Sequence, residues 1–221
     1  MPFHKVTSPL RLLVAAIVLS VLPAQAQNDI SSAFVAEEIS DSLFARMQGR
    51  SYPAGCTVPR ADLRHLRVLH YDLDGEVQAG EMVCNKAIAA DLLAIFRALY
   101  DAQYPIGEMR RIDDYDADDN RSMAAHNTSC FCYRRIAGSK RLSKHSLGMA
   151  VDINPLYNPW VRTVNGRTVV APVEATPYAD RKAAFPCKLT QSDLCTHLFI
   201  QYGFRWGGAW KNSKDYQHFE K

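Results

Sequence analysis

The residues best suited to chemistry lie in two short stretches of the chain. The stretch "SKHSLGMAVDINP" places His145 and Asp152 on either side of Gly148, and the later stretch "KDYQHF" contains Asp215 and His218. Two histidines and one carboxylate form a zinc set of catalytic type. Such a set leaves a coordination position for water, whose pKa the metal lowers from about 15.7 toward about 7. Another nearby carboxylate can accept that water's proton and pass it to a leaving amine.

The first stretch must bend if its two candidate ligands are to meet. Side chains alternate between the two faces of a strand, so Asp152 shares a face with the small residue Ala150. Gly148 can turn the chain sharply, which lets His145 fold back beside Asp152. Taken alone, the stretch fits a surface histidine and a capping carboxylate equally well. The second stretch adds the third ligand, His218, and favours a metal site.

The two stretches together resemble a known enzyme family. The pattern "SxHxxGxAxD", followed by "WGGAWKNSKDYQH", is similar to the LAS metallopeptidases. The nearest branch contains the D-Ala-D-Ala carboxypeptidases and L-Ala-D-Glu endopeptidases (VanY-like, peptidase family M15). The likeness spans roughly residues 110–219. It implies an α+β fold of the hedgehog/D-Ala-D-Ala metallopeptidase type, in which a small antiparallel sheet carries a zinc site and helices flank it.

The same resemblance implies roles for individual residues. His145, Asp152 and His218 would bind Zn²⁺, and Asp215 would be the general base and acid. An upstream arginine stabilises the oxyanion or holds a substrate carboxylate in this family, and Arg121 is the best match.

Other positions leave more than one interpretation open. Arg134 and Arg135 compete with Arg121 for the arginine role, and Arg121 also fits as an ion-pair partner of the acidic loop around it. Ser143 either hydrogen-bonds the substrate or braces the loop. Trp206 either walls the substrate cleft and dries it, or anchors the core.

The N-terminus has the pattern of a secretory signal peptide at residues 1–26, with a basic start, a short apolar run and "AQA" before the cut. The apolar run is about half of the roughly 20 residues that a membrane span needs, so we expect no stable membrane anchor. Residues 27–221 would form a single metallopeptidase domain. The six cysteines suggest disulfides in an oxidising compartment, with Cys187–Cys195 and Cys56–Cys84 as possible pairs.

Sequence patterns also predict the elements around the site. They are a helix over 28–49, a hairpin at Asp74-Gly75, a helix capped by Asn85, an acidic loop over 110–122, a strand over 128–136, a hairpin at Asn165-Gly166 and a helix within 189–203.

The whole chain carries a formal net charge of only +3, which gives no reason to expect a nucleic-acid partner. The resemblance and the leader together predict a monomeric periplasmic or secreted bacterial zinc peptidase that acts on peptidoglycan stem peptides. The alternative is a non-catalytic zinc-containing binding module of hedgehog-like fold, against which the carboxylate of Asp215 argues. The bond cleaved, and whether the enzyme acts at chain ends or internally, stay open.

Overall fold

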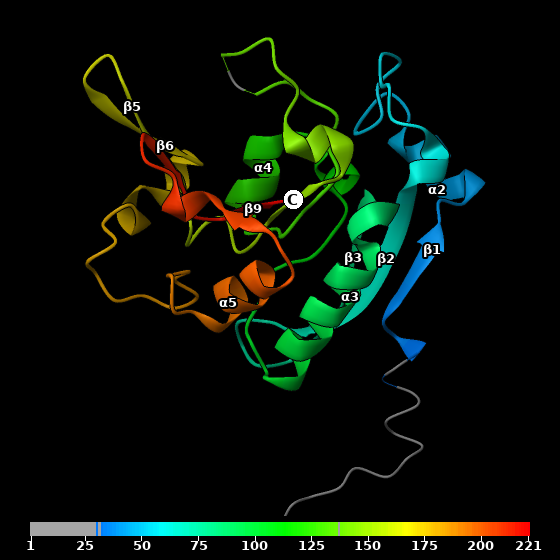
Figure 1. The fold of residues 1–221 in the computed structure, drawn as a ribbon, viewed down its shortest axis with the longest axis horizontal. Coiled ribbons are helices and arrows are strands. Elements are labelled where there is room, and N and C mark those ends of the chain that lie inside the picture. Colours follow the sequence, from blue (N-terminus) through cyan, green and yellow to red (C-terminus); the bar gives the residue numbers. More distant parts are fainter. Residues whose placement is uncertain (1–29, 31, 137) are drawn as a thin grey trace, which may run out of the picture.

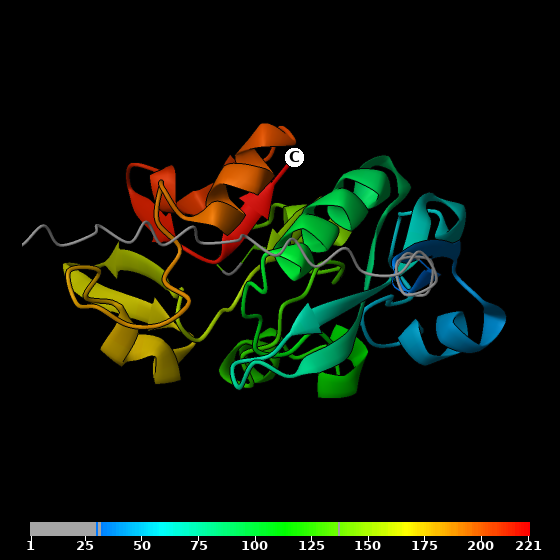
Figure 2. The same ribbon diagram turned by 90° about the horizontal axis from the view of Figure 1, so that it is seen from below.

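The computed structural model describes residues 30, 32–136 and 138–221. The predicted signal peptide, residues 1–26, lies outside the described residues, and the domain boundary at 27 stays a prediction. Within the described residues, no helix is both long enough and apolar enough to cross a bilayer. The chain combines small antiparallel sheets with a few helices, which confirms the predicted α+β class (Figure 1, Figure 2). Its hedgehog-like subtype stays a prediction.

The first sheet is a meander of three antiparallel strands in the order β1-β2-β3. Its strands are β1 (Val35–Glu38), β2 (Leu63–Tyr71) and β3 (Val77–Asn85). The β2–β3 pair confirms the predicted hairpin, although its connection runs from Asp72 to Glu76 and is longer than a two-residue turn. The Asp72 carboxylate accepts hydrogen bonds from the backbone N–H groups of Asp74 and Glu76, which stabilises this longer connection.

The helix α3 (Lys86–Asp101) packs against this sheet (Figure 1). Asn85 begins it as predicted, since its side-chain oxygen accepts a hydrogen bond from the N–H of Ala87 at 3.0 Å. One face of α3 is fully buried in the main core. The buried residues of that face are Ile88, Leu92, Ile95, Phe96 and Leu99. Each contributes about 1.5–3 kcal/mol by leaving water.

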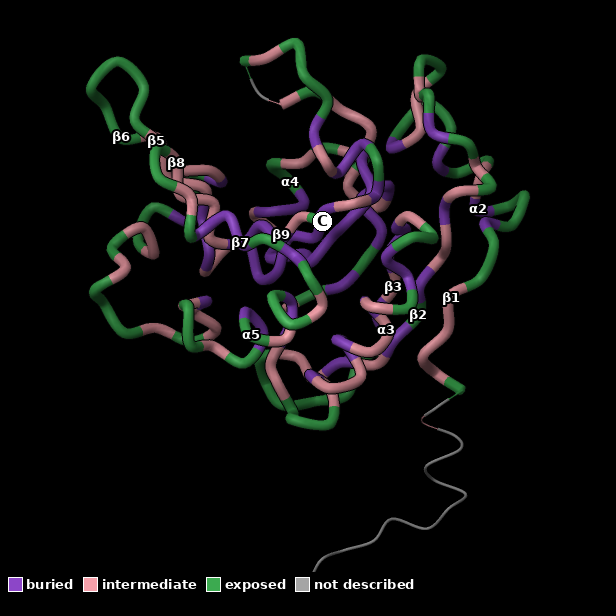
Figure 3. Tube along the Cα trace, in the orientation of Figure 1, coloured by how far each residue is buried: buried purple, intermediate pink, exposed green. Residues whose placement is uncertain are grey.

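Two smaller antiparallel sheets carry the C-terminal half of the chain, in the orders β4-β9-β7 and β6-β5-β8. Their strands are β4 (Ala150–Asp152), β5 (Trp160–Val164), β6 (Arg167–Ala171), β7 (Arg205–Trp206), β8 (Ser213–Asp215) and β9 (His218–Glu220). The predicted hairpin at Asn165-Gly166 is confirmed between β5 and β6, and both turn residues have positive φ. This hairpin projects from the body of the molecule, and its tip is exposed (Figure 3).

Short helices complete the described chain. They are α2 (Asp41–Met47), α4 (Asp119–Ala124), α5 (Leu194–Gln201) and the 3₁₀ helices η1 (Arg60–Asp62), η2 (Ile112–Tyr115), η3 (Lys144–Leu147), η4 (Val173–Tyr178) and η5 (Gly207–Ala209). The predicted helix within 189–203 is confirmed as α5, which begins after its cap Asp193. It packs against α3 through the edge-to-face contact of Phe199 with Phe96.

The predicted helix over 28–49 is wrong over residues 35–38. Val35–Glu38 is the strand β1, because its backbone pairs with β2 and tertiary pairing overrides the local pattern. After this strand the chain is helical over Asp41–Met47. Ser40 caps this short helix by accepting a hydrogen bond from the N–H of Leu43.

Two further segments differ from their predicted structure. The acidic segment 110–122 contains η2 and the start of α4, because the Asp118 carboxylate caps the N–H groups of Asn120 and Arg121. The segment 128–136 is extended but belongs to no named strand. Isolated bridges, such as that between Ser129 and Asp152, and single backbone hydrogen bonds, such as that from the N–H of Phe131 to the carbonyl of Val83, hold it.

The structure does not support the predicted disulfides, because all six cysteines are free. Cys56 packs against a small cluster beside α2, whereas Cys84 lies in the main core, so that suggested pair is separated. The thiol of Cys187 donates a hydrogen bond to the carbonyl of Pro105, and Cys195 is fully buried in the core. These positions make the thiols packing groups.

Gly148 gives a test of how closely the site region packs on the first sheet. Its φ is 65°, and an added Cβ would lie 2.6 Å from the backbone nitrogen of Asn85. We expect Gly148→Ala to lower the free energy of unfolding by about 2–4 kcal/mol, since left-handed strain and overpacking add. Gly166→Ala is the matched control, because Gly166 has φ 75° but nothing within 4 Å of an added Cβ.

The Gly166 variant should lose only about 1–2 kcal/mol, the cost of the left-handed conformation itself. Urea unfolding in the presence of a chelator measures both variants without a contribution from bound metal. Equal losses in the two variants would contradict the close approach to Asn85.

Candidate metal centre

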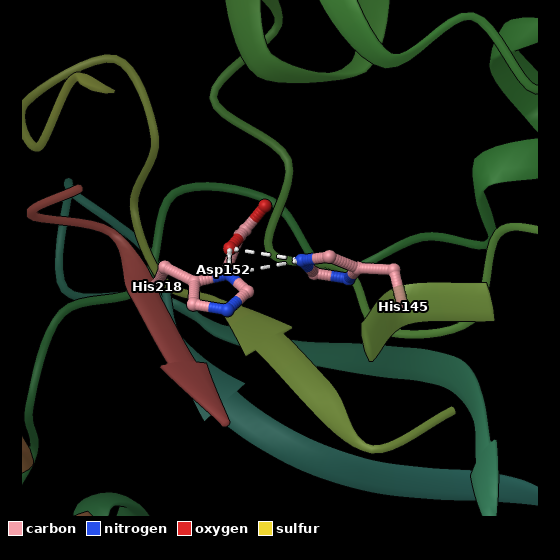
Figure 4. A group of neighbouring side chains, drawn as sticks. All are labelled: His145, Asp152 and His218. Atoms are coloured by element: carbon pink, nitrogen blue, oxygen red, sulfur yellow. Dashed lines mark hydrogen bonds and ion pairs between the residues drawn. The ribbon is translucent and has the colours of Figure 1, made fainter. Parts of the chain in front are cut away.

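Three side chains from separate elements point toward one another (Figure 4). His145 lies on η3, Asp152 ends β4 and His218 begins β9. Asp152 and His218 are directly opposite each other in the β4–β9 pair. Opposed side chains in an antiparallel pair lie on the same face. The register of this sheet therefore brings together two residues from distant parts of the sequence.

His145 reaches the other two residues through a capped turn. Ser143 begins η3, and its hydroxyl oxygen accepts a hydrogen bond from the N–H of His145 at 3.3 Å. Gly148 ends η3 in the left-handed conformation and directs the chain into β4. This geometry confirms that His145 folds back beside Asp152.

The three potential ligand atoms form a compact triangle. Asp152 Oδ1 lies 3.2 Å from His145 Nε2 and 3.0 Å from His218 Nδ1. The two imidazole nitrogens are 3.2 Å apart. Ligands held at 2.0–2.1 Å around a tetrahedral zinc ion are roughly 3.3 Å from one another. The donor types and their spacing therefore fit a metal ion of this kind.

Hydrogen bonds behind the ligands orient both imidazoles. His145 donates from Nδ1 to the carbonyl of Cys130 at 2.6 Å, which leaves Nε2 free to face a metal. His218 Nε2 lies 3.4 Å from a carboxylate oxygen of Glu220, which in turn pairs with Arg205 at 2.7 Å. Such outer partners fix the tautomer of a metal-binding histidine and raise its basicity.

The protonation of the metal-free group follows from burial and proximity. Burial alone raises the pKa of Asp152, but the adjacent imidazoles of His145 and His218 hold it well below its usual range. Burial lowers the pKa of His218, but hydrogen bonds to Asp152 and Glu220 outweigh this effect and raise it to about 10. A metal ion must therefore displace a proton in order to bind at neutral pH.

Asp215 is the additional carboxylate of the site. Burial raises the pKa of this side chain to about 7, although His218 and His145 oppose that effect. Its Oδ1 atom is buried and has no hydrogen-bond partner among the described residues. A buried acceptor without a partner is costly, so its position calls for a ligand. The geometry leaves Asp215 beside the metal ligands with one free oxygen.

The two glycines of the "WGG" stretch are explained by packing. An added Cβ on Gly207 would lie 2.5 Å from the backbone oxygen of Asp215 and 3.3 Å from the Cβ of His218. An added Cβ on Gly208 would collide with the indole of Trp206. The absence of side chains at these positions lets β8, β9 and Trp206 pack around the site.

A cleft of about 660 Å³ opens at the metal ligands. Asp215 and the three ligands lie on its wall, together with Trp160 from β5. The remaining lining comes largely from residues within 134–136 and 141–147 and from the C-terminal strands. A volume of this size is ample for a small-molecule or short-peptide ligand.

The predicted substrate-binding residues Ser143 and Trp206 differ in whether they line the cleft. Ser143 lines the cleft, although its hydroxyl oxygen already caps η3. Trp206 lies in the main core, and its indole N–H donates to the carbonyl of Tyr216 at 2.8 Å. Trp160 and Trp210 line the cleft instead. Substrate binding by Ser143 and Trp206 stays a prediction, and the position of Trp206 matches the core interpretation.

The three candidate arginines differ in their position relative to the cleft and in their ion pairs. Arg121 pairs with Asp116 at 2.7 Å, is 59% exposed and is not part of the cleft lining. Arg134 does line the cleft, and Asp119 holds its guanidinium at 2.7 Å. The Nε atom of Arg134 is buried and finds no hydrogen-bond partner within the part of the chain that the structure describes. Arg135 also lines the cleft, where its side chain donates to the carbonyl of Lys140.

Sequence reasoning missed three residues of this region. Glu220 could have been found, because it lies two positions after His218 on the same strand face. Trp160 and Arg162 carried no local signal. They reach the cleft because β5 pairs with β8, a contact that joins segments far apart in the sequence.

Comparison with known proteins agrees with the site. Residues 137–221 match a family model described as D-alanyl-D-alanine carboxypeptidase. The matched region contains all three potential metal ligands and Asp215. This match agrees with the family that the sequence resemblance predicted. No curated protein and no solved structure matches the chain.

Metal binding can be tested directly on the three ligands. We expect the purified protein to bind a single zinc ion and to gain about 2.7 kcal/mol of stability when free zinc is a hundredfold above its dissociation constant. Asp152→Ala and His218→Ala should lose both the metal and this gain. Metal analysis after dialysis and thermal unfolding with and without zinc measure these effects.

Two further variants refine that test. Glu220→Gln should weaken zinc binding by about 10–100-fold, since it removes the carboxylate behind His218. His197→Ala is the control, because His197 is exposed on α5. Undiminished zinc binding by His218→Ala would rule out this centre.

Proposed function

We propose that this protein is a periplasmic or secreted zinc peptidase that hydrolyses an amide bond in peptidoglycan stem peptides. The family match supports an activity of the D-Ala-D-Ala carboxypeptidase type. The predicted signal peptide supports the compartment, because the cell wall lies outside the inner membrane. The hydrolytic part of the proposal is carried by Asp215, a buried carboxylate with an unpartnered oxygen beside the metal ligands.

Each residue of the centre would have a defined role. His145, Asp152 and His218 would hold the zinc ion, which when bound polarises a carbonyl and acidifies water. Asp215 would accept the proton of the attacking water and deliver it to the leaving amine. Its burial keeps bulk water away from this transfer, and its free oxygen leaves an acceptor for the proton.

Arg134 is better placed than Arg121 to stabilise the negative charge that develops on the carbonyl oxygen. Arg134 lines the cleft, and its ion pair with Asp119 fixes the orientation of its guanidinium. A charge held in place before the reaction needs no reorganisation when the oxyanion forms. We therefore assign the oxyanion role to Arg134, which was a competitor of Arg121 in the sequence.

The charges along the cleft fit a peptide that carries carboxylates. The basic side chains of the lining are Arg134, Arg135, Arg141, Lys144, Arg162 and Arg205. The acidic ones are Asp119, Asp152, Asp215 and Glu220. Asp152 would be neutralised by a bound metal, and Asp119 and Glu220 already pair with arginines. The cleft is thus positive, apart from Asp215, and favours an anionic peptide.

The role of Asp215 can be tested by an isosteric change. We expect Asp215→Asn to lower kcat by about 10²–10⁴-fold, because it removes the proton acceptor, while zinc content stays unchanged. Asp74→Asn in the exposed β2–β3 connection is the control and should keep full activity. Mass spectrometry of digested peptidoglycan measures turnover and identifies the bond cleaved.

The same assay distinguishes the peptidase from its rival. Chelation should abolish cleavage by the unaltered protein, and zinc should restore it. A zinc-loaded protein that cleaves no stem peptide would instead favour a non-catalytic zinc-containing binding module.

Substitutions of Arg134 and Arg121 should have different effects on kcat. Arg134→Lys should lower kcat by about 100-fold or more, because a point charge replaces the fixed planar guanidinium at the oxyanion. Arg121→Lys should leave kcat within about twofold, since exposed ion pairs contribute little. Melting temperatures of both variants control for folding. The reverse order of the two losses would return the oxyanion role to Arg121.

A further inference from the structure

One face of the β6-β5-β8 sheet forms a wall of the cleft. Trp160 is directly opposite Asp215 in the β5–β8 pair, and Arg162 is directly opposite Ser213. Opposed side chains share a face, and alternate residues of a strand share it too. Trp160, Arg162 and Asp215 therefore stand on the same face, and all three line the cleft.

The guanidinium of Arg162 is held by its neighbours on this face. It lies over the ring of Trp160, with its central carbon 4.1 Å from the ring centroid. Trp160 is itself fixed, because its indole N–H donates to the hydroxyl oxygen of Ser213 on β8. Stacking on an aromatic ring orients an arginine and leaves its N–H donors free to bind a ligand.

Arg162 lacks the polar partner that such a position calls for. Among the described residues, its buried Nε atom has no hydrogen-bond partner, and no acidic side chain pairs with it. Arg134 and Arg205 line the same cleft but each has an acidic partner. A buried donor without a partner is costly, and a planar guanidinium is suited to a carboxylate that would bind in two-point fashion.

The strand geometry places this donor relative to the reacting bond. Arg162 is two residues along β5 from Trp160, the partner of Asp215. Two strand residues span roughly 6.6 Å, which is also the length of about two residues of an extended peptide. A peptide that presents its amide to Asp215 and lies along this face would pass Arg162 within about two residues of that amide.

We propose that Arg162 binds a carboxylate of the peptide substrate, within about two residues of the amide that is cleaved, and so determines which peptides are accepted. This inference rests on the proposed peptidase function. A stem pentapeptide carries free carboxylates on its D-Glu residue and at its terminal D-Ala. Arg162 thus selects for a free carboxylate at one of these positions over the corresponding amide.

Binding of four matched peptides tests this proposal. They are the stem pentapeptide with both carboxylates free, with the D-Glu carboxylate amidated, with the C-terminus amidated and with both amidated. Calorimetry with the zinc-loaded Asp215→Asn protein, alone and combined with Arg162→Gln, Arg162→Lys or Arg167→Gln, measures binding without turnover. Arg167 is the control, because it lies at the exposed tip of the same hairpin and outside the cleft lining.

We expect Arg162→Gln to weaken binding of the fully free peptide by about tenfold or more, the usual size of a lost charge-assisted hydrogen bond. For the parent protein, amidation of the carboxylate that Arg162 binds should weaken peptide binding by the same factor. With that amidated peptide, Arg162→Gln should cause no further loss of affinity. Arg162→Lys should retain part of the discrimination. The Arg167 variant should match the parent protein.

The outcomes separate this proposal from the proposed function. A uniform loss for all four peptides, or no loss for any, would show that Arg162 only supports the hairpin, and would overturn the proposal. If the protein binds the peptides with the expected discrimination but the unaltered enzyme cleaves none, the peptidase function fails while the role of Arg162 stands. If no peptide binds at all, both fail.

Discussion

The pairing of Asp152 with His218 across β4 and β9 is the constraint on which the site depends. A slip of one residue would turn both side chains to the other face of the sheet. The two strands are each only three residues long, so the ladder alone specifies the register weakly. Contacts outside the β4–β9 pair reinforce this register. Ser129 exchanges backbone hydrogen bonds with Asp152 on the opposite edge of β4, at 3.1 and 2.9 Å, and the ring of Phe219 stacks on that of Phe199 in the core.

The cleft holds polar atoms that the protein itself does not satisfy. Asp215 Oδ1 and the Nε atoms of Arg134 and Arg162 are buried, and no described residue forms a hydrogen bond with them. Such atoms destabilise a fold, typically by about 1–3 kcal/mol each. Here they stand around one cavity and include both signs of charge. Their arrangement is complementary to a ligand with a proton to give up and with negative charges to be held, as an amide bond in an acidic peptide would provide during hydrolysis.

Sequence reasoning succeeded where the chemistry is local. His145, Gly148 and Asp152 lie within one turn and strand, so their meeting could be predicted from spacing. The position of the arginine could not, because it depends on how the loop after Cys132 and the helix α4 approach the cleft. The strand β1 was missed for a similar reason, since only its pairing with β2 overrides a helical pattern. The free cysteines were missed because a count of thiols does not show which thiols the fold brings together.

The hydrogen bond to the carbonyl of Cys130 connects the site to residues that lie before the matched region. It accepts the hydrogen bond that orients His145, while the next residue, Phe131, donates its N–H to Val83 of the first sheet. Gly148, in turn, accepts a hydrogen bond from the N–H of Asn85. The region that matches the peptidase family begins at residue 137, so these supports lie before it. The matched region therefore does not contain all the contacts that hold His145 and Gly148 in place, because part of this support comes from residues 83–131.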